Sequence, residues 1–269
     1  MDLLLVRSLW GVDLPWDDAF PRIRAAGYGA IEAPMPPPPE RTRFRDALDA
    51  HGFPYIAMVF TEGTTPGEHA ASLARQLGEA TDLGAHLVVA HSGRDGWDDD
   101  ANAAYFAAAL NAEAAGGLPV AHETHRGRIL YNPWTTARML GRLPELRLCC
   151  DFSHWVVVCE RLLGTEGETV AAAAARCIHL HARVGFEEGP QVPDPLAPEY
   201  APHLAAHETW WDAVWDAQEA RGDAVTTLTP EYGPPAYLHT IPGTGEPVAD
   251  LWAVCDAQAQ RQAARFARR

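Results

Sequence analysis

The sequence is short of positive charge. Its 269 residues carry 21 Lys and Arg against 36 Asp and Glu, which gives a formal net charge of −15 at pH 7. Proteins that bind nucleic acids normally present a basic surface, because contacts to the phosphate backbone supply much of the affinity. The composition therefore disfavours a nucleic-acid partner. It favours a small substrate that is neutral or is bound with the help of a cation.

Cysteine is scarce and has no metal-binding spacing. The five cysteines are odd in number and none belongs to a CxxC pair; they are Cys149, Cys150, Cys159, Cys177 and Cys255. This excludes a structural zinc site built from thiolates. Three of the five stand inside apolar runs, so we expect small hydrophobic core residues in a reducing cytoplasm.

The sequence also lacks a long hydrophobic run and a glycine-rich nucleotide motif. No apolar stretch approaches the length of a membrane span, and the N-terminal "MDLLLVRSLWGVD" has no basic leader. We therefore expect neither a signal peptide nor a membrane partner, and a cytoplasmic location. No GxGxxG follows the first strand-like run, which disfavours a dinucleotide-binding fold.

What the sequence does contain is a regular alternation of strand-like and helical segments. The strand-like runs are 3–8, 29–33, 54–60, 86–91, 118–123, 146–151, 177–181 and 224–229. Helical patterns fall near 16–26, 40–51, 67–83, 98–115, 134–142, 167–175, 207–221 and 247–267. Alternation of this kind predicts a parallel sheet, because parallel strands need crossover helices. Eight units in a chain of this length predict an α/β fold of the (β/α)8 TIM barrel type, as a single domain spanning 1–269.

One connection is predicted to be unusually long. Between the seventh strand and the next helix, a loop at about 182–206 contains the Pro-rich stretch "GPQVPDPLAPEYAPHL". Long loops in compact domains often serve as lids or binding loops, although a stiff surface decoration explains the composition equally well.

Polar side chains end each of the last four predicted strands. Glu123, Asp151, His181 and Glu231 each follow or close an apolar run. The carboxyl ends of parallel barrel strands face one common mouth, so these side chains are expected to converge there. Three carboxylates in one place would repel one another, and a divalent cation would compensate them. Oxygen-rich ligation with one nitrogen favours Mn²⁺ or Mg²⁺, with Co²⁺ or Zn²⁺ as alternatives.

The order of these motifs resembles the xylose-isomerase-like barrel superfamily, which contains sugar and sugar-phosphate isomerases and epimerases. In that family strand two ends in Glu, strand five in a ligand Glu, strand six in D-x-x-H, strand seven in H-x-H and strand eight in Glu. The corresponding elements here are Glu32 in "GYGAIEAPM", Glu123 in "AHETHRG", Asp151 and His154 in "DFSH", His179 and His181 in "HLH", and Glu231 in "PEY".

The resemblance implies a ligand set and a chemistry. The metal would be held by Glu123, Asp151, His181 and Glu231, and in the epimerase branch both glutamates also transfer protons. A metal that holds a carbonyl and a neighbouring hydroxyl oxygen stabilises an enediolate, so that a carboxylate becomes an adequate base. The expected activity is isomerisation or epimerisation of a sugar or keto-sugar.

Four further residues are candidates for substrate binding. His154 would lie over the mouth and contact substrate, although it could instead orient Asp151. Arg183 resembles an arginine that contacts substrate in some family members, and such a side chain can hold a carboxylate, phosphate or hydroxyl oxygen. His91, at the end of strand four, is as readily a packing residue, and His125 could reach substrate or be solvated.

The remaining histidines and tryptophans receive less specific interpretations. His179 and His181 share one strand face, and His181 is nearer the mouth, so His179 is expected to be a core or supporting residue. His122 should point toward the helices, and Trp10 could form an apolar wall against a sugar. The tryptophans at helical spacing are packing residues or a subunit contact, which leaves a homodimer open; they are Trp210, Trp211 and Trp215.

Three alternatives to an isomerase or epimerase stay open. A dehydratase or lyase needs the same first deprotonation, so the sequence barely separates the two. A DNA-repair endonuclease of the same superfamily uses a three-metal cluster, but the strand-three end, "VFTEG", lacks a histidine and the chain is acidic. The last alternative is a non-catalytic protein that binds a metal or a sugar.

Overall fold

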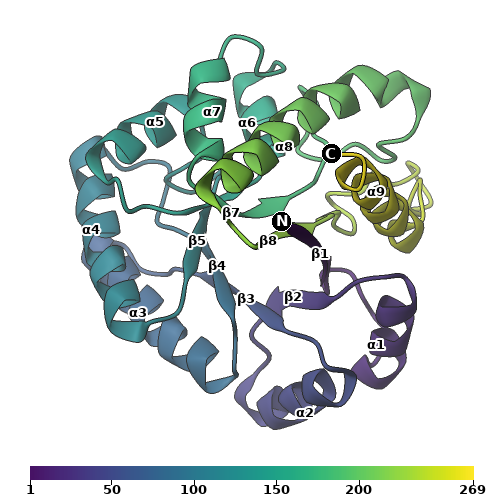
Figure 1. The fold of residues 1–269 in the computed structure, drawn as a ribbon, viewed down its shortest axis with the longest axis horizontal. Helices are drawn as coiled ribbons and strands as arrows, with labels where there is room; N and C mark the ends of the chain where they lie inside the picture. The colour runs from purple at the N-terminus through teal and green to yellow at the C-terminus, as the bar shows by residue number, and fades with distance from the viewer.

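Eight parallel strands close into a barrel in the computed structural model, which describes residues 1–269 (Figure 1). The strands pair in sequence order, and β1 pairs with β8 to complete the ring. They are β1 (Asp2–Ser8), β2 (Ala30–Pro34), β3 (Tyr55–Phe60), β4 (Leu87–His91), β5 (Val120–Glu123), β6 (Leu148–Cys150), β7 (Cys177–His181) and β8 (Val225–Thr229). The predicted single-domain TIM barrel is confirmed.

Helices form a ring around the strands, and the C-terminal helix packs against the N-terminal strand (Figure 1). The α-helices are α1 (Trp16–Ala25), α2 (Arg41–His51), α3 (Pro66–Asp82), α4 (Asp99–Gly116), α5 (Pro133–Arg142), α6 (Phe152–Cys159), α7 (Gly167–Ala174), α8 (Ala201–Arg221) and α9 (Leu251–Phe266). Two short 3-10 helices, η1 (Pro38–Glu40) and η2 (Pro198–Tyr200), precede α2 and α8. None of the helices combines the length and the hydrophobicity that a membrane crossing requires.

The sequence pattern predicts eight helices, whereas the structure has nine α-helices, because α6 was missed. This helix starts directly after β6, and its sequence, "FSHWVVVC", is largely apolar and contains a run of three β-branched valines. Such a composition has no helical periodicity and favours a strand. The helix is initiated by Asp151, whose Oδ1 accepts a hydrogen bond of 3.0 Å from the backbone N–H of Ser153.

The predicted long loop is also shorter than expected. Helix α8 begins at Ala201 and not at 207, so only residues 182–197 separate β7 from η2. Pro202 occupies the first turn of α8, where proline is tolerated because its missing N–H would have no partner inside the helix. A proline that suggested a continuing loop therefore lies inside a helix.

Two apolar layers hold the barrel together. A large cluster of 52 buried residues fills the space between strands and helices and includes Trp211 and Trp215. A small cluster inside the barrel consists of Val6, Ala30, Ile56, Val89, Ala121 and Cys149. The helix tryptophans are thus packing residues of this chain, and all five cysteines are buried and free, as predicted.

The inner cluster determines which side chains reach the mouth. Side chains two positions apart on a strand point to the same face. Moving two residues toward the carboxyl ends from the inner cluster gives the next inward layer, which is Ser8, Glu32, Met58, His91, Glu123 and Asp151. On four of these six strands, the inward side chain thus changes from apolar to ionisable two residues nearer the mouth, at Glu32, His91, Glu123 and Asp151.

Candidate active site

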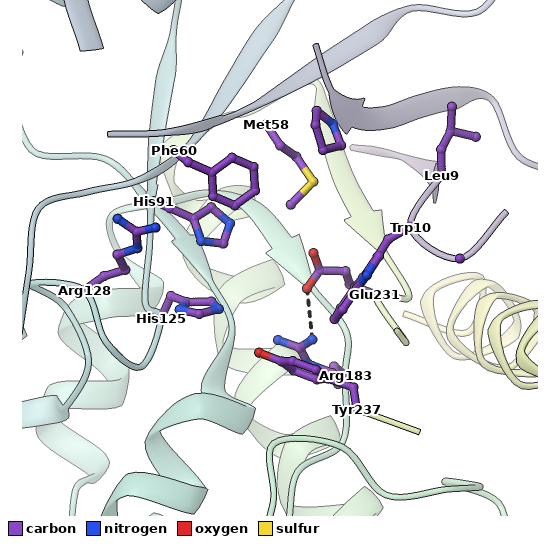
Figure 2. Close-up of a pocket in the computed structure, with 12 residues that line it drawn as sticks. Leu9, Trp10, Met58, Phe60, His91, His125, Arg128, Arg183, Glu231 and Tyr237 are labelled. Carbon is purple, nitrogen blue, oxygen red and sulfur yellow. Dashed lines mark ion pairs between the residues drawn. The ribbon is translucent and has the colours of Figure 1, made fainter. Parts of the chain in front are cut away.

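A cavity of about 540 Å³ opens at the carboxyl ends of the strands (Figure 2). Its lining combines aromatic and aliphatic walls with basic side chains and one carboxylate; the residues are Leu9, Trp10, Gly11, Pro34, Met58, Phe60, His91, His125, Arg128, Arg183, Glu231 and Tyr237. All four proposed substrate-binding residues are near it: His91, His125 and Arg183 line it, and His154 packs against His125 with ring centroids 3.9 Å apart.

The four side chains that end the last strands meet at this cavity. Glu123, Asp151, His181 and Glu231 each offer one ligand-type atom, and these four atoms lie within 4.8 Å of one another. Their exposed fractions are 3% or less. The structure therefore brings together the complete set that the sequence proposed as a cation site, although the residues span more than a hundred positions.

His181 is held by carboxylates on both of its ring nitrogens. Its Nε2 lies 2.9 Å from Oε1 of Glu32, and its Nδ1 lies 3.3 Å from both Glu123 Oε1 and Glu231 Oε2. Burial lowers the pKa of His181, but Cys149, Glu231 and Glu32 outweigh it and hold the pKa well above its ordinary value. In the cation-free protein the ring therefore carries a proton on each nitrogen.

Glu32 has a supporting role that the sequence analysis did not assign. Besides His181, its carboxylate contacts His179 Nε2 at 3.3 Å and accepts a hydrogen bond of 2.5 Å from Thr229 Oγ1. Burial would raise the pKa of Glu32, but the two histidines lower it, so the side chain is a carboxylate. A glutamate on the inward face of an apolar strand was the available signal for this role. Of the two roles expected for His179, a core residue or a supporting residue, the contact with Glu32 matches the second.

Asp151 and Arg183 form a second buried ion pair. Nη2 of Arg183 lies 2.5 Å from Oδ2 of Asp151, and Nη1 lies 3.3 Å from Oε2 of Glu231 (Figure 2). Oδ1 of Asp151 accepts hydrogen bonds from the backbone and hydroxyl of Ser153. Burial raises the pKa of Asp151 to about 6 despite the arginine. Arg183 thus bridges two of the candidate ligands in addition to lining the cavity.

Three histidines form a row beside the candidate ligands. The rings of His91 and His125 are 4.6 Å apart, and the His125 ring packs against that of His154 at an angle of 50°. Burial lowers the pKa of His125 to about 3 and that of His154 well below its ordinary value. Both rings are therefore neutral. Nε2 of His154 accepts a hydrogen bond of 2.7 Å from Arg183, so this histidine contacts the ion pair.

The chemistry of these residues fits a divalent cation. Oε2 of Glu123 lies 2.7 Å from Nε2 of His91, yet both atoms are buried without a hydrogen-bond partner. Burial raises the pKa of Glu123, but His91, His125 and His181 reverse this and hold it well below its usual range. A buried carboxylate oxygen with an unused lone pair is costly, and coordination of a cation would remove that cost.

Two smaller groups of ligand-type side chains also have their ligand atoms within 4.8 Å of one another. Glu123, His125 and His154 form one, which shares Glu123 with the main group. The other combines Cys149 with His179 and His181, but burial raises the pKa of the Cys149 thiol well above its ordinary value. The main group is the one that offers three carboxylates, as Mn²⁺ and Mg²⁺ prefer.

His122 and Trp10 lie where the sequence placed them. His122 points outward, where Nδ1 contacts Ser92 Oγ at 2.6 Å and Nε2 contacts Glu113 at 2.7 Å. Trp10 forms a cavity wall and meets Tyr237 edge to face at 4.7 Å. The other walls were not identified from the sequence, because Met58, Phe60 and Tyr237 look like ordinary core or loop residues there.

A sequence profile of the xylose isomerase-like TIM barrel family matches residues 20–193. The chain belongs to this family. No curated protein sequence matches the chain significantly. The matched range contains Glu123, Asp151 and His181 and ends before Glu231.

Solved structures share the fold of this xylose isomerase-like barrel at low sequence identity. A xylose isomerase-like TIM barrel protein from Mycobacterium smegmatis in complex with magnesium is 13% identical, with a TM-score of 0.63 over 96% of this chain and 94% of that one. The probable 3-DHS dehydratase AsbF from Bacillus anthracis is 12% identical, with a TM-score of 0.62 and coverage of 96% and 98%. The 3-keto-D-glucoside 4-epimerase YcjR from E. coli is 14% identical, with a TM-score of 0.57 and coverage of 100% and 99%.

Proposed function

We propose that this protein is a divalent-metal-dependent isomerase or epimerase of a sugar or keto-sugar. The observation that carries the proposal is the convergence of Glu123, Asp151, His181 and Glu231 at the base of a cavity large enough for a small substrate. The fold shared with an epimerase and with a magnesium-bound barrel supports it. These four side chains would hold the cation, with Mn²⁺ or Mg²⁺ preferred and Co²⁺ or Zn²⁺ as alternatives.

The two glutamates are the proposed proton carriers. Glu123 is ionised, because the histidines around it keep its pKa low, and Glu231 reaches the cavity wall. When bound, the cation would polarise a substrate carbonyl and so acidify the adjacent C–H bond. Under that condition a carboxylate is a sufficient base, and its position matters as much as its pKa. One glutamate takes the proton and the other returns one.

The other polar groups would orient the substrate. Arg183 and His154 form a hydrogen-bonded pair at the base of the cavity, and Arg183 also forms ion pairs with Asp151 and Glu231. His91 and His125 lie next to each other on the wall, where either ring can contact a substrate hydroxyl. Trp10 and Tyr237 supply an apolar surface for a sugar face.

The composition excludes one competing way to activate a carbonyl. The chain contains no lysine, so no side chain can form a Schiff base with a keto group. Carbonyl activation in this cavity therefore depends on hydrogen bonding and on the proposed cation, which fits the carboxylate-rich base of the cavity.

A dehydratase is the second candidate, and the fold shared with AsbF favours it. Both reactions begin with removal of a proton beside a carbonyl. Incubation of candidate keto-sugars in heavy water separates them: an isomerase or epimerase incorporates deuterium without loss of water, whereas a dehydratase releases water and forms an unsaturated product.

The direct test of the proposal is the Glu231→Gln variant, which keeps the side-chain shape and removes the base. We expect turnover to fall by at least about 10²-fold, because positioned proton transfer contributes a factor of this size. Circular dichroism and the melting temperature should change little. The matched control is Glu145→Gln, which alters an exposed carboxylate before β6, at the opposite end of the barrel. Full activity of Glu231→Gln would refute the assignment.

The proposal also includes a cellular location and a type of partner. Five buried free cysteines are consistent with a cytoplasmic protein. The proposed partner is a small sugar-like molecule, with no nucleic acid or membrane, and a homodimer stays a prediction that measurement of the solution mass would test.

A further inference from the structure

Arg128 is fixed at the cavity by the backbone of two neighbouring loops. Its Nη1 atom donates to the carbonyl oxygens of Thr61, after β3, and Gly93, after β4, each at 3.3 Å. The side chain is half-buried and lines the cavity. Because Nη1 makes both hydrogen bonds, the guanidinium is held in place while the edge formed by Nε and Nη2 makes no bond to the protein.

The free edge of Arg128 is the one that binds oxyanions. Nε and Nη2 donate to no protein acceptor, and neither atom is enclosed by protein. No carboxylate forms an ion pair with this arginine, although the chain has 36 acidic residues against 21 basic ones. Two parallel N–H groups match the two oxygens of a carboxylate or phosphate, so this edge can bind such a group bidentately.

Arg183, the other arginine of the cavity, is already committed. Its guanidinium pairs with Asp151 and Glu231 at the base, whereas Arg128 lies on the other side of the cavity, with His91 and His125 between (Figure 2). A substrate whose reacting carbons lie beside Glu231 would therefore extend toward Arg128. The rings of Phe60 and His91, 4.4 Å apart, form the wall along this path.

We propose that Arg128 forms an oxyanion subsite, so that the substrate is an acidic sugar derivative carrying a carboxylate or phosphate remote from its reacting carbons. This inference rests on the proposed function for the orientation of the substrate, but the subsite itself is defined by binding. It narrows the substrate class from sugars in general to keto-sugar acids or sugar phosphates. It also explains an unpaired arginine in the cavity of an otherwise acidic protein.

The test measures binding of matched ligands to the Mn²⁺-loaded protein by calorimetry. D-Glucitol, D-gluconate and D-glucitol 6-phosphate share a carbon skeleton and differ in the presence and type of anion. We expect at least one anionic ligand to bind about 10- to 100-fold more tightly than D-glucitol, the range of one or two charge-assisted hydrogen bonds. The tighter of the two anions shows which group the subsite accepts.

Variants of Arg128 and Arg126 show which side chain causes the preference for an anionic ligand. Arg128→Gln should remove the preference for the anion and leave the affinity for D-glucitol within about twofold, since only the charge-assisted bonds are lost. Arg126→Gln is the matched control, because Arg126 carries the same charge two residues away, is exposed, and lies over the Tyr237 ring. Arg128→Lys keeps the charge without the bidentate edge, and it should retain only part of the preference.

The outcomes separate this inference from the proposed reaction. Equal preference for the anion in the wild type and Arg128→Gln, or no preference in the wild type, overturns the subsite whatever the protein catalyses. If Arg128→Gln does not fold, the comparison of Arg128→Lys with Arg126→Gln decides in the same way. A preference that depends on Arg128, without turnover of any ketose, supports the subsite and refutes the isomerase.

Discussion

Nε2 of His181 lies 2.9 Å from Oε1 of Glu32, which ties β7 to a strand three positions away around the barrel. This bond places the Nε2 proton on the Glu32 side and turns Nδ1 toward Glu123 and Glu231. A histidine that ligates a metal usually donates its second N–H to a carboxylate or carbonyl, which fixes both the tautomer and the ring orientation. Glu32 is the carboxylate that accepts the second N–H of His181 in this way.

The first prediction concerns this pair. Glu32→Gln should weaken the binding of Mn²⁺ by about 10- to 100-fold, because a neutral amide holds the ring less firmly and lowers its basicity. Glu113→Gln is the matched control, since it breaks a similar carboxylate–histidine pair, with His122, on the outer face of β5. Calorimetric titration measures both. Equal loss of affinity in the two variants would show that Glu32 has no specific role.

The second prediction concerns protons released on metal uptake. Burial raises the pKa of Asp151 to about 6, and the acidic neighbours of His181 hold its pKa well above the ordinary value despite burial. Both groups must be deprotonated to ligate a cation, so protonation competes with binding as the pH falls. The affinity for Mn²⁺ should therefore rise between pH 5 and pH 8, with the release of about one to two protons.

Titrations in buffers of different ionisation enthalpy count these protons. At pH 5 both Asp151 and His181 contribute, whereas at pH 8 the count should fall toward the contribution of His181 alone. An affinity independent of pH across this range would contradict the ligand assignment.

The third prediction concerns the wall of the cavity. A Cβ atom added at Gly233 would lie 2.2 Å from the Trp10 indole, so Gly233→Ala must displace that ring. We expect KM to rise by about tenfold with a smaller change in kcat, as for the loss of a contact made equally in the ground and transition states. Steady-state kinetics on a turned-over ketose measures the two constants. An unchanged KM would show that Trp10 does not contact the substrate.

The fourth prediction concerns stability and also supplies a control for the third. Gly78 is exposed in the middle of α3, has no atom within 4 Å of an added Cβ, and needs no left-handed backbone. Gly78→Ala should stabilise the fold by about 0.5–1 kcal/mol, because glycine loses more backbone entropy on folding. Thermal unfolding should show a rise of about 2–4 °C per kcal/mol. Destabilisation by this variant would contradict the description of α3.

Much of the fold and part of the site could be predicted from the sequence. The alternation of strands and helices determined a parallel barrel, and the period of two along each strand determined which residues face inward. That is why Glu123, Asp151, His181 and Glu231 could be proposed as one group, and why His122 could be assigned to the outer face. These inferences need only the local geometry of a strand and the rule that parallel carboxyl ends share one mouth.

Only the closed barrel decided how these residues contact one another. Three contacts join segments from different strands and loops. They are the Glu32–His181 pair, the bridge from Arg183 to Asp151 and Glu231, and the hydrogen bonds that hold Arg128 and leave its other edge free. Such contacts depend on the register and curvature of the sheet, and no local periodicity encodes them. Helix α6 is the converse case: its largely apolar, β-branched sequence favours a strand, and burial of most of its side chains in the fold outweighs that local preference.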